Sequence, residues 1–286
     1  MTSFGNPIRA RFRLLTILAV LLYLVVRQQF IRSAAFLIEE MHVDGLRVDL
    51  TQAIHRDNTL HADGRQIGNA NILGQKFLRE WSRTLRMIKP TVIAEDHTEW
   101  DAVTKPPAQG GLGFSAKWEL AFYHQLIGDS DMAGNRAQLL KQAGFGGNEP
   151  LQMDWFAGAL YDSCYDQVVF HESHDEAGNA GGTARTMVTA ANGAPLIGAT
   201  RIVAEARSRV CCGLTLLSTG TPMFFMGEEI GAQKHYTYDR FILNRENIIG
   251  ERTGNCKALF RFYQDLISLS HRLRSIRSQD IDILHL

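Results

Sequence analysis

Short apolar segments of strand length alternate along this chain with longer segments that have the apolar periodicity of helices. The three clearest strands are DGLRVDL, TVIAED and QVVFHESHDE, at residues 44–50, 91–96 and 167–176. The expected helices cover approximately residues 27–41, 72–88, 119–127, 135–143, 200–217 and 257–273. Strands that alternate with helices form βαβ units, in which the strands are parallel. We therefore expect an α/β fold with functional residues at the carboxyl ends of its strands.

Acidic residues close each expected strand. Asp49, Glu95 and Asp175 lie at the ends of the three segments, and Glu228 and Glu229 close a fourth, TPMFFMGEE. An acidic residue after a single strand indicates little, because it is often the N-cap of the next helix. Four strands that end in this way at the same edge of a parallel sheet indicate carboxylates that converge on one site.

The sequence lacks the motifs that are typical of several other kinds of functional site. No glycine-rich phosphate loop follows a strand, and no GxSxG motif is present. The histidines of HESH lie at a strand end and not on a helix, so a zinc site is not supported, and we expect neither metal nor cofactor. The 30 acidic and 30 basic residues balance, which gives no indication of nucleic-acid binding. Four cysteines without metal-ligand spacing are expected to be reduced core thiols.

Carboxylates combined with an arginine suit glycoside chemistry. In that chemistry one carboxylate attacks the anomeric carbon and another protonates the leaving oxygen. Arg47 and Asp49 are two residues apart on a strand and therefore share a face. The guanidinium would keep Asp49 ionised, as a nucleophile requires. Glu95, on another strand, would hold its proton if its pocket were partly desolvated.

The same segments resemble the signature regions of the α-amylase superfamily, glycoside hydrolase family 13. DGLRVDLTQAIH resembles the second region, VIAEDHTEW the third and FHESHDE the fourth, while TPMFFMGEE is similar to the eighth-strand segment. GLGFSAKWELAFYHQL resembles the sixth-strand region. The similarity is greatest to glycogen and starch branching enzymes and to maltooligosyl-trehalose trehalohydrolases.

The resemblance implies a (β/α)8 TIM barrel and a retaining mechanism. It matches Asp49 to the nucleophile, Glu95 to the acid/base and Asp175 to the third carboxylate, which binds sugar hydroxyls in the distorted transition state. Arg47 and His174 match the flanking substrate-binding residues.

Four further acidic or imidazole side chains of these motifs have lesser expected roles. We include Glu172 as a further substrate-binding candidate, and interpret His171 as a satisfied core histidine. Glu228 and Glu229 are expected to support the site or to cap a helix.

The resemblance extends over roughly residues 27–286 and includes only strands four to eight of such a barrel. Strands one to three, and the first signature with its Asn-His pair, are missing from the expected pattern. We therefore expect a partial barrel domain at 27–280. It follows an atypical N-terminal segment at 1–26 and precedes the start of a truncated C-terminal β-sandwich at 281–286.

The N-terminal segment contains an uncharged run of 13 residues, 14–26, after Arg9, Arg11 and Arg13. It is shorter than the roughly 20 residues that span a bilayer, so stable membrane insertion is not expected. A buried core segment is one interpretation of the run, and a signal peptide or short anchor over residues 9–27 is another. The expected localisation is cytoplasmic.

The predicted function is that of a 1,4-α-glucan branching enzyme, with glycogen, starch or maltooligosaccharide as the substrate. An amylase-type or trehalohydrolase-type hydrolase is an alternative, since it shares the covalent glycosyl-enzyme and differs only in the acceptor. A second alternative is an inactive remnant, because five strands leave the barrel open at two edges.

Overall fold

The computed structural model describes residues 24–56, 71–88, 91–127, 137–143 and 150–285. The chain forms two compact units, Met1–Trp118 and Glu119–Leu286. This division falls inside the segment 27–280, which the sequence analysis treated as one domain.

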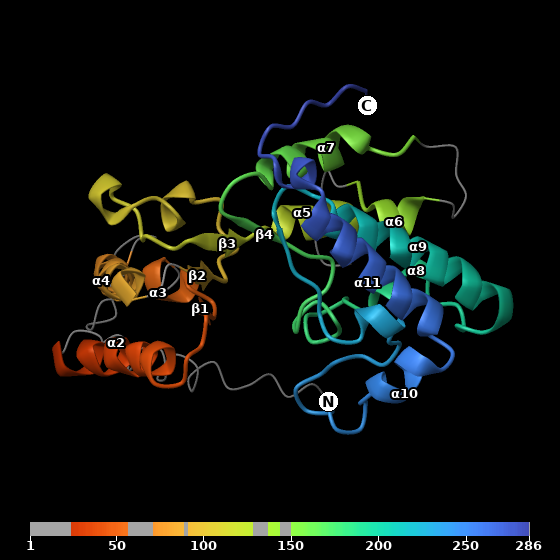
Figure 1. The fold of residues 1–286 in the computed structure, drawn as a ribbon, viewed down its shortest axis with the longest axis horizontal. Coiled ribbons are helices and arrows are strands. Elements are labelled where there is room, and N and C mark those ends of the chain that lie inside the picture. The colour runs from red at the N-terminus through yellow and green to blue at the C-terminus, as the bar shows by residue number, and fades with distance from the viewer. Residues whose placement is uncertain (1–23, 57–70, 89–90, 128–136, 144–149, 286) are drawn as a thin grey trace. The chain divides into compact units, whose positions relative to one another are not determined.

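The first unit is a parallel β-α-β arrangement (Figure 1). Its described α-helices and β-strands are α2 (Leu24–Glu39), β1 (Gly45–Val48), α3 (Gln52–His55), α4 (Ile72–Ile88), β2 (Thr91–Ala94) and β3 (Ala116–Trp118). Strand β2 pairs in parallel with β1 on one side and with β3 on the other. Val48 is in register with Ala94, and Ala94 with Lys117, so the residues that follow β1 and β2 lie at the same edge.

Helix α4 covers this sheet because its apolar residues recur on one face. Phe77, Trp81 and Leu85 follow one another at intervals of four residues and are buried. Asn71 starts the helix, since its side-chain oxygen accepts a hydrogen bond from the backbone N–H of Gly74 at 3.0 Å. Helix α2 packs against the same core. Burying one such large side chain stabilises the fold by about 1.5–3 kcal/mol.

Gly74 also permits α3 and α4 to approach each other closely. A Cβ atom at this position would lie 1.7 Å from the carbonyl oxygen of Ile54. Any larger residue would push the turn after β1 away from α4, and that turn carries part of the site described below.

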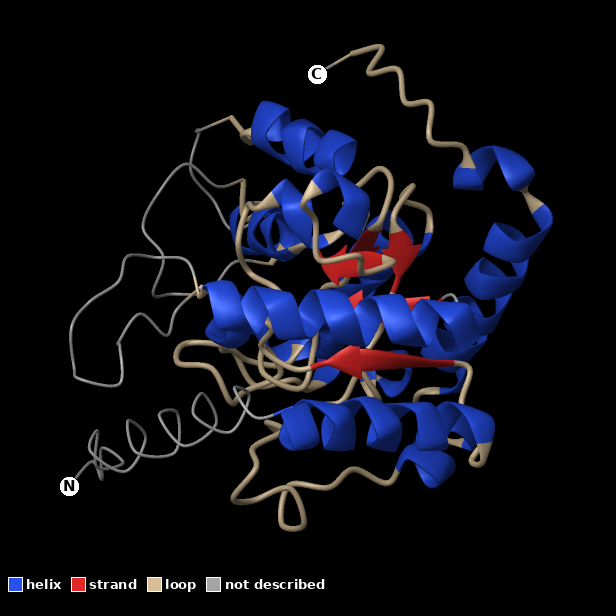
Figure 2. Ribbon diagram, turned by 90° about the vertical axis from the view of Figure 1, so that its left-hand side faces the viewer, coloured by secondary structure: helices blue, strands red, loops and turns tan. Residues whose placement is uncertain are grey.

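The second unit contains more helix than strand. Helix also predominates over strand in the described residues as a whole, as Figure 2 shows. The described α-helices and β-strands of the second unit are α5 (Leu120–Leu126), α6 (Leu139–Gln142), α7 (Met153–Asp162), β4 (Gln167–Val169), α8 (Thr186–Ala190), α9 (Gly198–Leu216), β5 (Thr221–Pro222), α10 (Ile248–Thr253) and α11 (Lys257–Arg272). Strands β4 and β5 are parallel, with Val169 in register with Pro222. Helices α9 and α11 lie side by side (Figure 1) and share an apolar core that includes Cys212, Leu259 and Tyr263.

The expected α/β fold with parallel strands is confirmed. The described residues contain five strands, three in the first unit and two in the second. All four cysteines are buried and free, as expected. Residues 281–285 form no strand, so the expected first strand of a β-sandwich is absent from the described part of that segment.

The apolar N-terminal run falls almost entirely outside the described residues. Only its last three residues, 24–26, are described, and they form the start of α2. Among the described helices, none is both long enough and apolar enough to cross a membrane.

Candidate active site

Asp49 and Glu95 directly follow the parallel strands β1 and β2 of the first unit. The register between the strands places these two residues next to each other at the carboxyl edge. One carboxylate oxygen of Asp49 lies within 4.8 Å of one of Glu95. The Asp49 side chain is well exposed, whereas that of Glu95 is 3% exposed. The two carboxylates therefore share one location in clearly different environments.

Arg47 connects the two carboxylates. Its Nη1 atom lies 3.1 Å from Oδ1 of Asp49, and its Nη2 atom donates a hydrogen bond to Oε2 of Glu95. The guanidinium also lies over the ring of Trp118, 4.5 Å from the ring centre. Arg47 therefore supplies positive charge to both carboxylates.

Glu95 is held in its ionised form. Burial alone raises the pKa of its carboxyl group. Hydrogen bonds from His97 and from the backbone N–H of Leu50, an interaction with Asp49 and the charge of Arg47 together outweigh that effect and lower the pKa from 4.5 to about 2. The Leu50 hydrogen bond to Oε2 measures 3.0 Å. From the sequence, Glu95 was expected to hold its proton if its pocket were partly desolvated. The pocket is desolvated, but the neighbours of Glu95 lower its pKa more than burial raises it.

Trp118 and His97 were not identified as site residues from the sequence. Trp118 ends β3, beside β2, and its ring faces Arg47. His97 lies 3.4 Å from Oε1 of Glu95 through its Nε2 atom. Both residues lie inside motifs that the sequence analysis quoted, so position next to a strand end was the signal that could have identified them.

His174 and Asp175 follow β4 in the second unit. Both side chains are partly exposed, and His174 Nε2 lies 3.9 Å from Asp175 Oδ2. The hydroxyl group of Tyr238 donates a hydrogen bond of 2.7 Å to Oδ1 of Asp175. Tyr238 is a further residue that the sequence did not reveal, because it is 63 positions from Asp175 and belongs to no strand-end motif.

Glu172 does not lie where a sugar could contact it. Its side chain is 2% exposed, and Oε2 lies 3.1 Å from Nη2 of Arg185, which is also buried. Oε1 accepts a hydrogen bond from the backbone N–H of Thr186. Burial raises the pKa of Glu172 more than Arg185 lowers it, so the pKa is above its usual value. In place of the expected substrate contact, Glu172 makes a structural ion pair that connects the segment after β4 to the start of α8.

His171 and Glu228 form a second buried pair. Nε2 of His171 lies 2.8 Å from Oε2 of Glu228, and Nδ1 lies 2.9 Å from the hydroxyl of Thr215. Tyr263 donates a hydrogen bond to the same oxygen of Glu228. Burial lowers the pKa of His171, but the neighbouring Glu228 carboxylate more than compensates and raises it. The expectation of a satisfied core histidine is confirmed, and Glu228 links the segments that follow β4 and β5.

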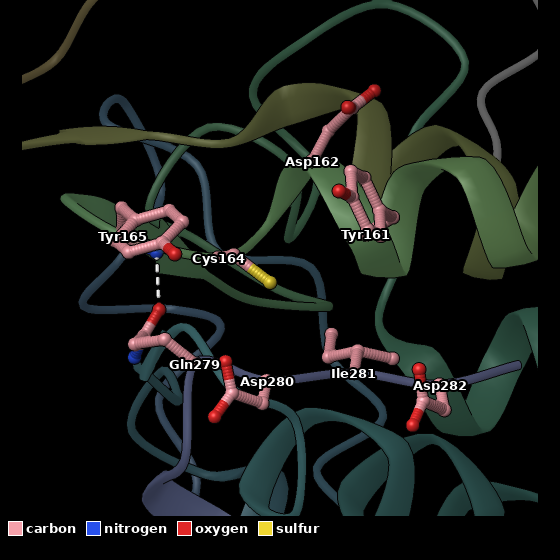
Figure 3. A pocket seen from close by; sticks show the side chains of 8 residues that line it. All are labelled: Tyr161, Asp162, Cys164, Tyr165, Gln279, Asp280, Ile281 and Asp282. Carbon is pink, nitrogen blue, oxygen red and sulfur yellow. Dashed lines mark hydrogen bonds between the residues drawn. The ribbon is translucent and has the colours of Figure 1, made fainter.

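A separate cavity of about 400 Å³ lies at the other end of β4 (Figure 3). Its lining residues are Tyr161, Asp162, Cys164, Tyr165, Gln279, Asp280, Ile281 and Asp282. Gln279 closes one wall by accepting a hydrogen bond from the backbone N–H of Tyr165. Cys164 and Tyr165 precede β4, whereas His174 and Asp175 follow it. The cavity is therefore distinct from the candidate site.

Comparison with known proteins relates the sequence to glucan branching enzymes. No protein-family model matches the chain. A 1,4-alpha-glucan branching enzyme of Nocardia farcinica is 26% identical over 230 residues, which cover 75% of this chain and 27% of that enzyme. A branching enzyme of Prochlorococcus marinus is 37% identical over 109 residues, which cover 36% of this chain and 14% of that enzyme. The chain thus spans about a quarter or less of the relatives it matches.

Solved structures that resemble the chain include pullulanases. The pullulanase of Bacillus acidopullulyticus superposes with a TM-score of 0.61 at 16% identity, over 89% of this chain and 29% of that protein. A pullulanase of Anoxybacillus sp. LM18-11, solved in complex with maltotriose, superposes with a TM-score of 0.61 at 17% identity. The match covers 88% of this chain and 33% of that protein. These similarities show the fold.

Proposed function

We propose that this chain, a relative of the branching enzymes of the α-amylase superfamily, carries the catalytic residues of a retaining enzyme that acts on α-1,4-glucans. The observation that carries the proposal is the pairing of Asp49 and Glu95 at adjacent strand ends. One carboxylate oxygen of each lies within 4.8 Å of the other, and Arg47 contacts both side chains. Retaining enzymes have carboxyl groups about 5–5.5 Å apart, whereas inverting enzymes need about 6.5–9.5 Å to admit a water molecule.

Asp49 is the nucleophile in this proposal. Its carboxylate attacks the anomeric carbon of a glucosyl unit, the glycosidic bond breaks, and Glu95 gives a proton to the leaving oxygen. In the second step Glu95 takes a proton from the 6-hydroxyl group of another glucan chain. The oxygen of that hydroxyl displaces Asp49 and forms a branch with the original configuration retained. If water replaces the glucan hydroxyl, the product is that of hydrolysis.

The acid role of Glu95 requires a change in its surroundings when substrate binds. The free chain holds the Glu95 carboxylate ionised through His97, Leu50 and Arg47. A sugar that contacts Asp49 would exclude water from the exposed side of the pair. This desolvation raises the pKa of Glu95 toward the value that a general acid needs.

Asp175 and His174, in the second unit, are proposed to bind sugar hydroxyls. Tyr238 orients Asp175 through its hydrogen bond. We further propose that β1–β5 correspond to strands four to eight of a (β/α)8 barrel, which the similarity to pullulanases supports. The proposed substrates are glycogen, starch and maltooligosaccharides. The proposed location is the cytoplasm, which cell fractionation would test.

Incubation of the purified chain with amylose tests the proposal. A branching enzyme decreases the iodine stain and creates α-1,6 linkages, visible by proton NMR, without new reducing ends. A hydrolase increases the reducing ends instead. The Asp49→Asn variant should lose the activity, since an amide cannot act as the nucleophile. The Asp44→Asn variant, an equal change just before the amino end of β1, should keep it.

Inactivity of the folded chain would contradict the proposal and favour the inactive-remnant alternative. Activity that survives in Asp49→Asn would place the nucleophile elsewhere. If reducing ends rise and no α-1,6 linkage forms, the hydrolytic alternative is correct and the roles of Asp49 and Glu95 still stand.

A further inference from the structure

Asp96 lies beside the proposed acid/base in the sequence but is enclosed in the protein. Its side chain is inaccessible to solvent, whereas Asp49 on the neighbouring strand end is exposed. Its Oδ2 atom accepts a hydrogen bond of 2.7 Å from the Thr51 hydroxyl and lies 2.6 Å from Nε2 of His55. Its Oδ1 atom accepts hydrogen bonds from the backbone N–H and the hydroxyl of Thr98. Both carboxylate oxygens are thus fully occupied.

These contacts connect two separate segments. Thr51 and His55 belong to the turn and short helix α3 that follow β1, whereas Asp96 and Thr98 belong to the loop that follows β2. The ring of His55 packs against Trp100, with 5.0 Å between the ring centres. The Asp96 carboxylate is therefore a buried anchor between the segment that carries Asp49 and the segment that carries Glu95.

The turn held by this anchor has a strained backbone. Leu50, between Asp49 and Thr51, has a φ angle of 42°, a left-handed conformation that a branched side chain adopts only under constraint. Its N–H points at Oε2 of Glu95, and the N–H of Thr51 bonds to the backbone oxygen of Glu95 at 2.9 Å. Without the anchor, Leu50 can relax, and that relaxation moves Asp49 and withdraws a donor from Glu95.

We propose that Asp96 and His55 are positioning residues that fix the separation between Asp49 and Glu95. Neither touches the sugar. They act by holding the Leu50 turn in its strained conformation. The consequence for catalysis rests on the proposed function, whereas the positioning itself does not. The Asp96 carboxylate is suited to this task because it remains charged: burial raises its pKa, but the hydrogen bonds from His55, Thr98 and Thr51 lower it further.

The pKa of Glu95 reports on this positioning without any need for activity. We expect Asp96→Asn to raise it from about 2 toward 4.5, because Leu50 and Arg47 no longer hold the carboxylate in place. The measurement is a carbon-detected NMR titration of the glutamate carboxyl groups in the full chain. Removing the negative charge of Asp96 acts in the opposite direction, since fewer nearby anions lower the pKa of a carboxyl group. A rise in the pKa of Glu95 therefore distinguishes positioning from simple electrostatics.

Two further variants keep the test decisive. Asp101→Asn is the matched control, because Asp101 is exposed, pairs with Lys105 and lies outside the anchor. It should leave the pKa of Glu95 unchanged. If Asp96→Asn does not fold, Thr51→Val removes only one neutral donor and should give a smaller rise. A pKa of Glu95 that stays at about 2 or falls in the folded variants would overturn the proposal.

The kinetic comparison separates this inference from the proposed function. If the chain branches or hydrolyses amylose, Asp96→Asn should lower kcat by roughly 10- to 100-fold with little change in KM, since small misplacements of reacting groups have effects of that size. His55→Gln, which keeps a donor toward Asp96, should restore most of the rate relative to His55→Leu. If the wild-type chain is inactive, the proposed function fails, and the titration of Glu95 still decides whether Asp96 positions it.

Discussion

Arg47 on β1 donates a hydrogen bond to Glu95, the residue that follows β2. The parallel register makes this contact possible, since Val48 and Ala94 lie opposite each other and the flanking side chains meet at the strand ends. One arginine thereby influences the charge of the proposed acid/base and also contacts the proposed nucleophile two residues away on its own strand.

Replacing Arg47 should raise the pKa of Glu95. A lysine at this position has a single charged nitrogen and cannot contact both carboxylates with the geometry of a guanidinium. We expect the pKa of Glu95 in Arg47→Lys to lie between about 2 and 4.5, and that in Arg47→Met to be higher still. NMR titration of the carboxyl groups measures both. Arg83→Lys, on the exposed side of α4, should leave Glu95 unchanged, and an equal rise in that variant would refute the assignment to Arg47.

The stability of the chain in acid should depend on Glu95. Its pKa is about 2 in the folded chain and 4.5 when unperturbed, so the ionised form favours folding. This contribution is fully present above pH 4.5 and is lost as the pH falls toward 2. At 1.36 kcal/mol for each pKa unit, the full difference corresponds to about 3 kcal/mol, and the part lost by pH 3 to about 2 kcal/mol.

Urea unfolding at pH 6 and pH 3 tests this expectation. The free energy of unfolding of the wild-type chain should fall by about 2 kcal/mol more than that of Glu95→Gln, which has no charge to lose. Glu99→Gln, at an exposed position in the same loop, should behave like the wild type. Equal losses in the wild type and Glu95→Gln would mean that Glu95 is not held ionised by its neighbours.

Helix boundaries were predictable from the sequence where a capping residue and a repeating apolar face mark the helix. The expected helix 72–88 matches α4, because Asn71 caps its start and apolar residues repeat on one face. Helix α7 was not expected. Its sequence, MDWFAGALYD, has apolar residues on every side, and Trp155 and Tyr161 are 41% and 60% exposed, so no periodic pattern marks it as a helix.

The candidate site was predictable in part, and there is a physical reason why the remaining residues could not be predicted. Strand alternation located Arg47, Asp49 and Glu95, because these residues lie in or next to regular strands. Beyond a strand end the alternation stops, and the sequence no longer tells which side chains face inward. For that reason Glu172 was expected to contact substrate, while the structure buries it against Arg185. Contacts between distant segments, such as that of Tyr238 with Asp175, have no local signal.

If Asp175 and His174 bind glucan as proposed, Tyr238→Phe should weaken that binding. The change removes the hydroxyl that donates to Asp175 and keeps the ring, which packs near His174. A hydrogen bond to a charged group contributes about 1.5–3 kcal/mol when shielded, and the exposure of Tyr238 reduces this. We expect kcat/KM on amylose, or maltooligosaccharide affinity measured by calorimetry, to fall about three- to tenfold. Tyr236→Phe is the control, and an equal loss there would argue against a specific role for Tyr238.

Glu172 and Arg185 should determine stability more than substrate binding. Both side chains are almost completely buried, so Glu172→Gln leaves a guanidinium in the core without its counter-charge. Breaking a buried ion pair in this way lowers the free energy of unfolding by about 3–5 kcal/mol. Replacing both residues, as Glu172→Leu with Arg185→Met, removes the unpaired charge and should lower it less than the single change does.

Chemical denaturation of the single and double variants measures these differences. Asp265→Asn is the control, since Asp265 pairs with Arg261 on the exposed face of α11 and should change the free energy of unfolding by no more than about 1 kcal/mol. If Glu172 contacted glucan instead, Glu172→Gln would raise KM, and the free energy of unfolding would stay near that of the wild type. A double variant less stable than the single one would show that Arg185 is held chiefly by Met226 and the ring of Phe225, which it also contacts.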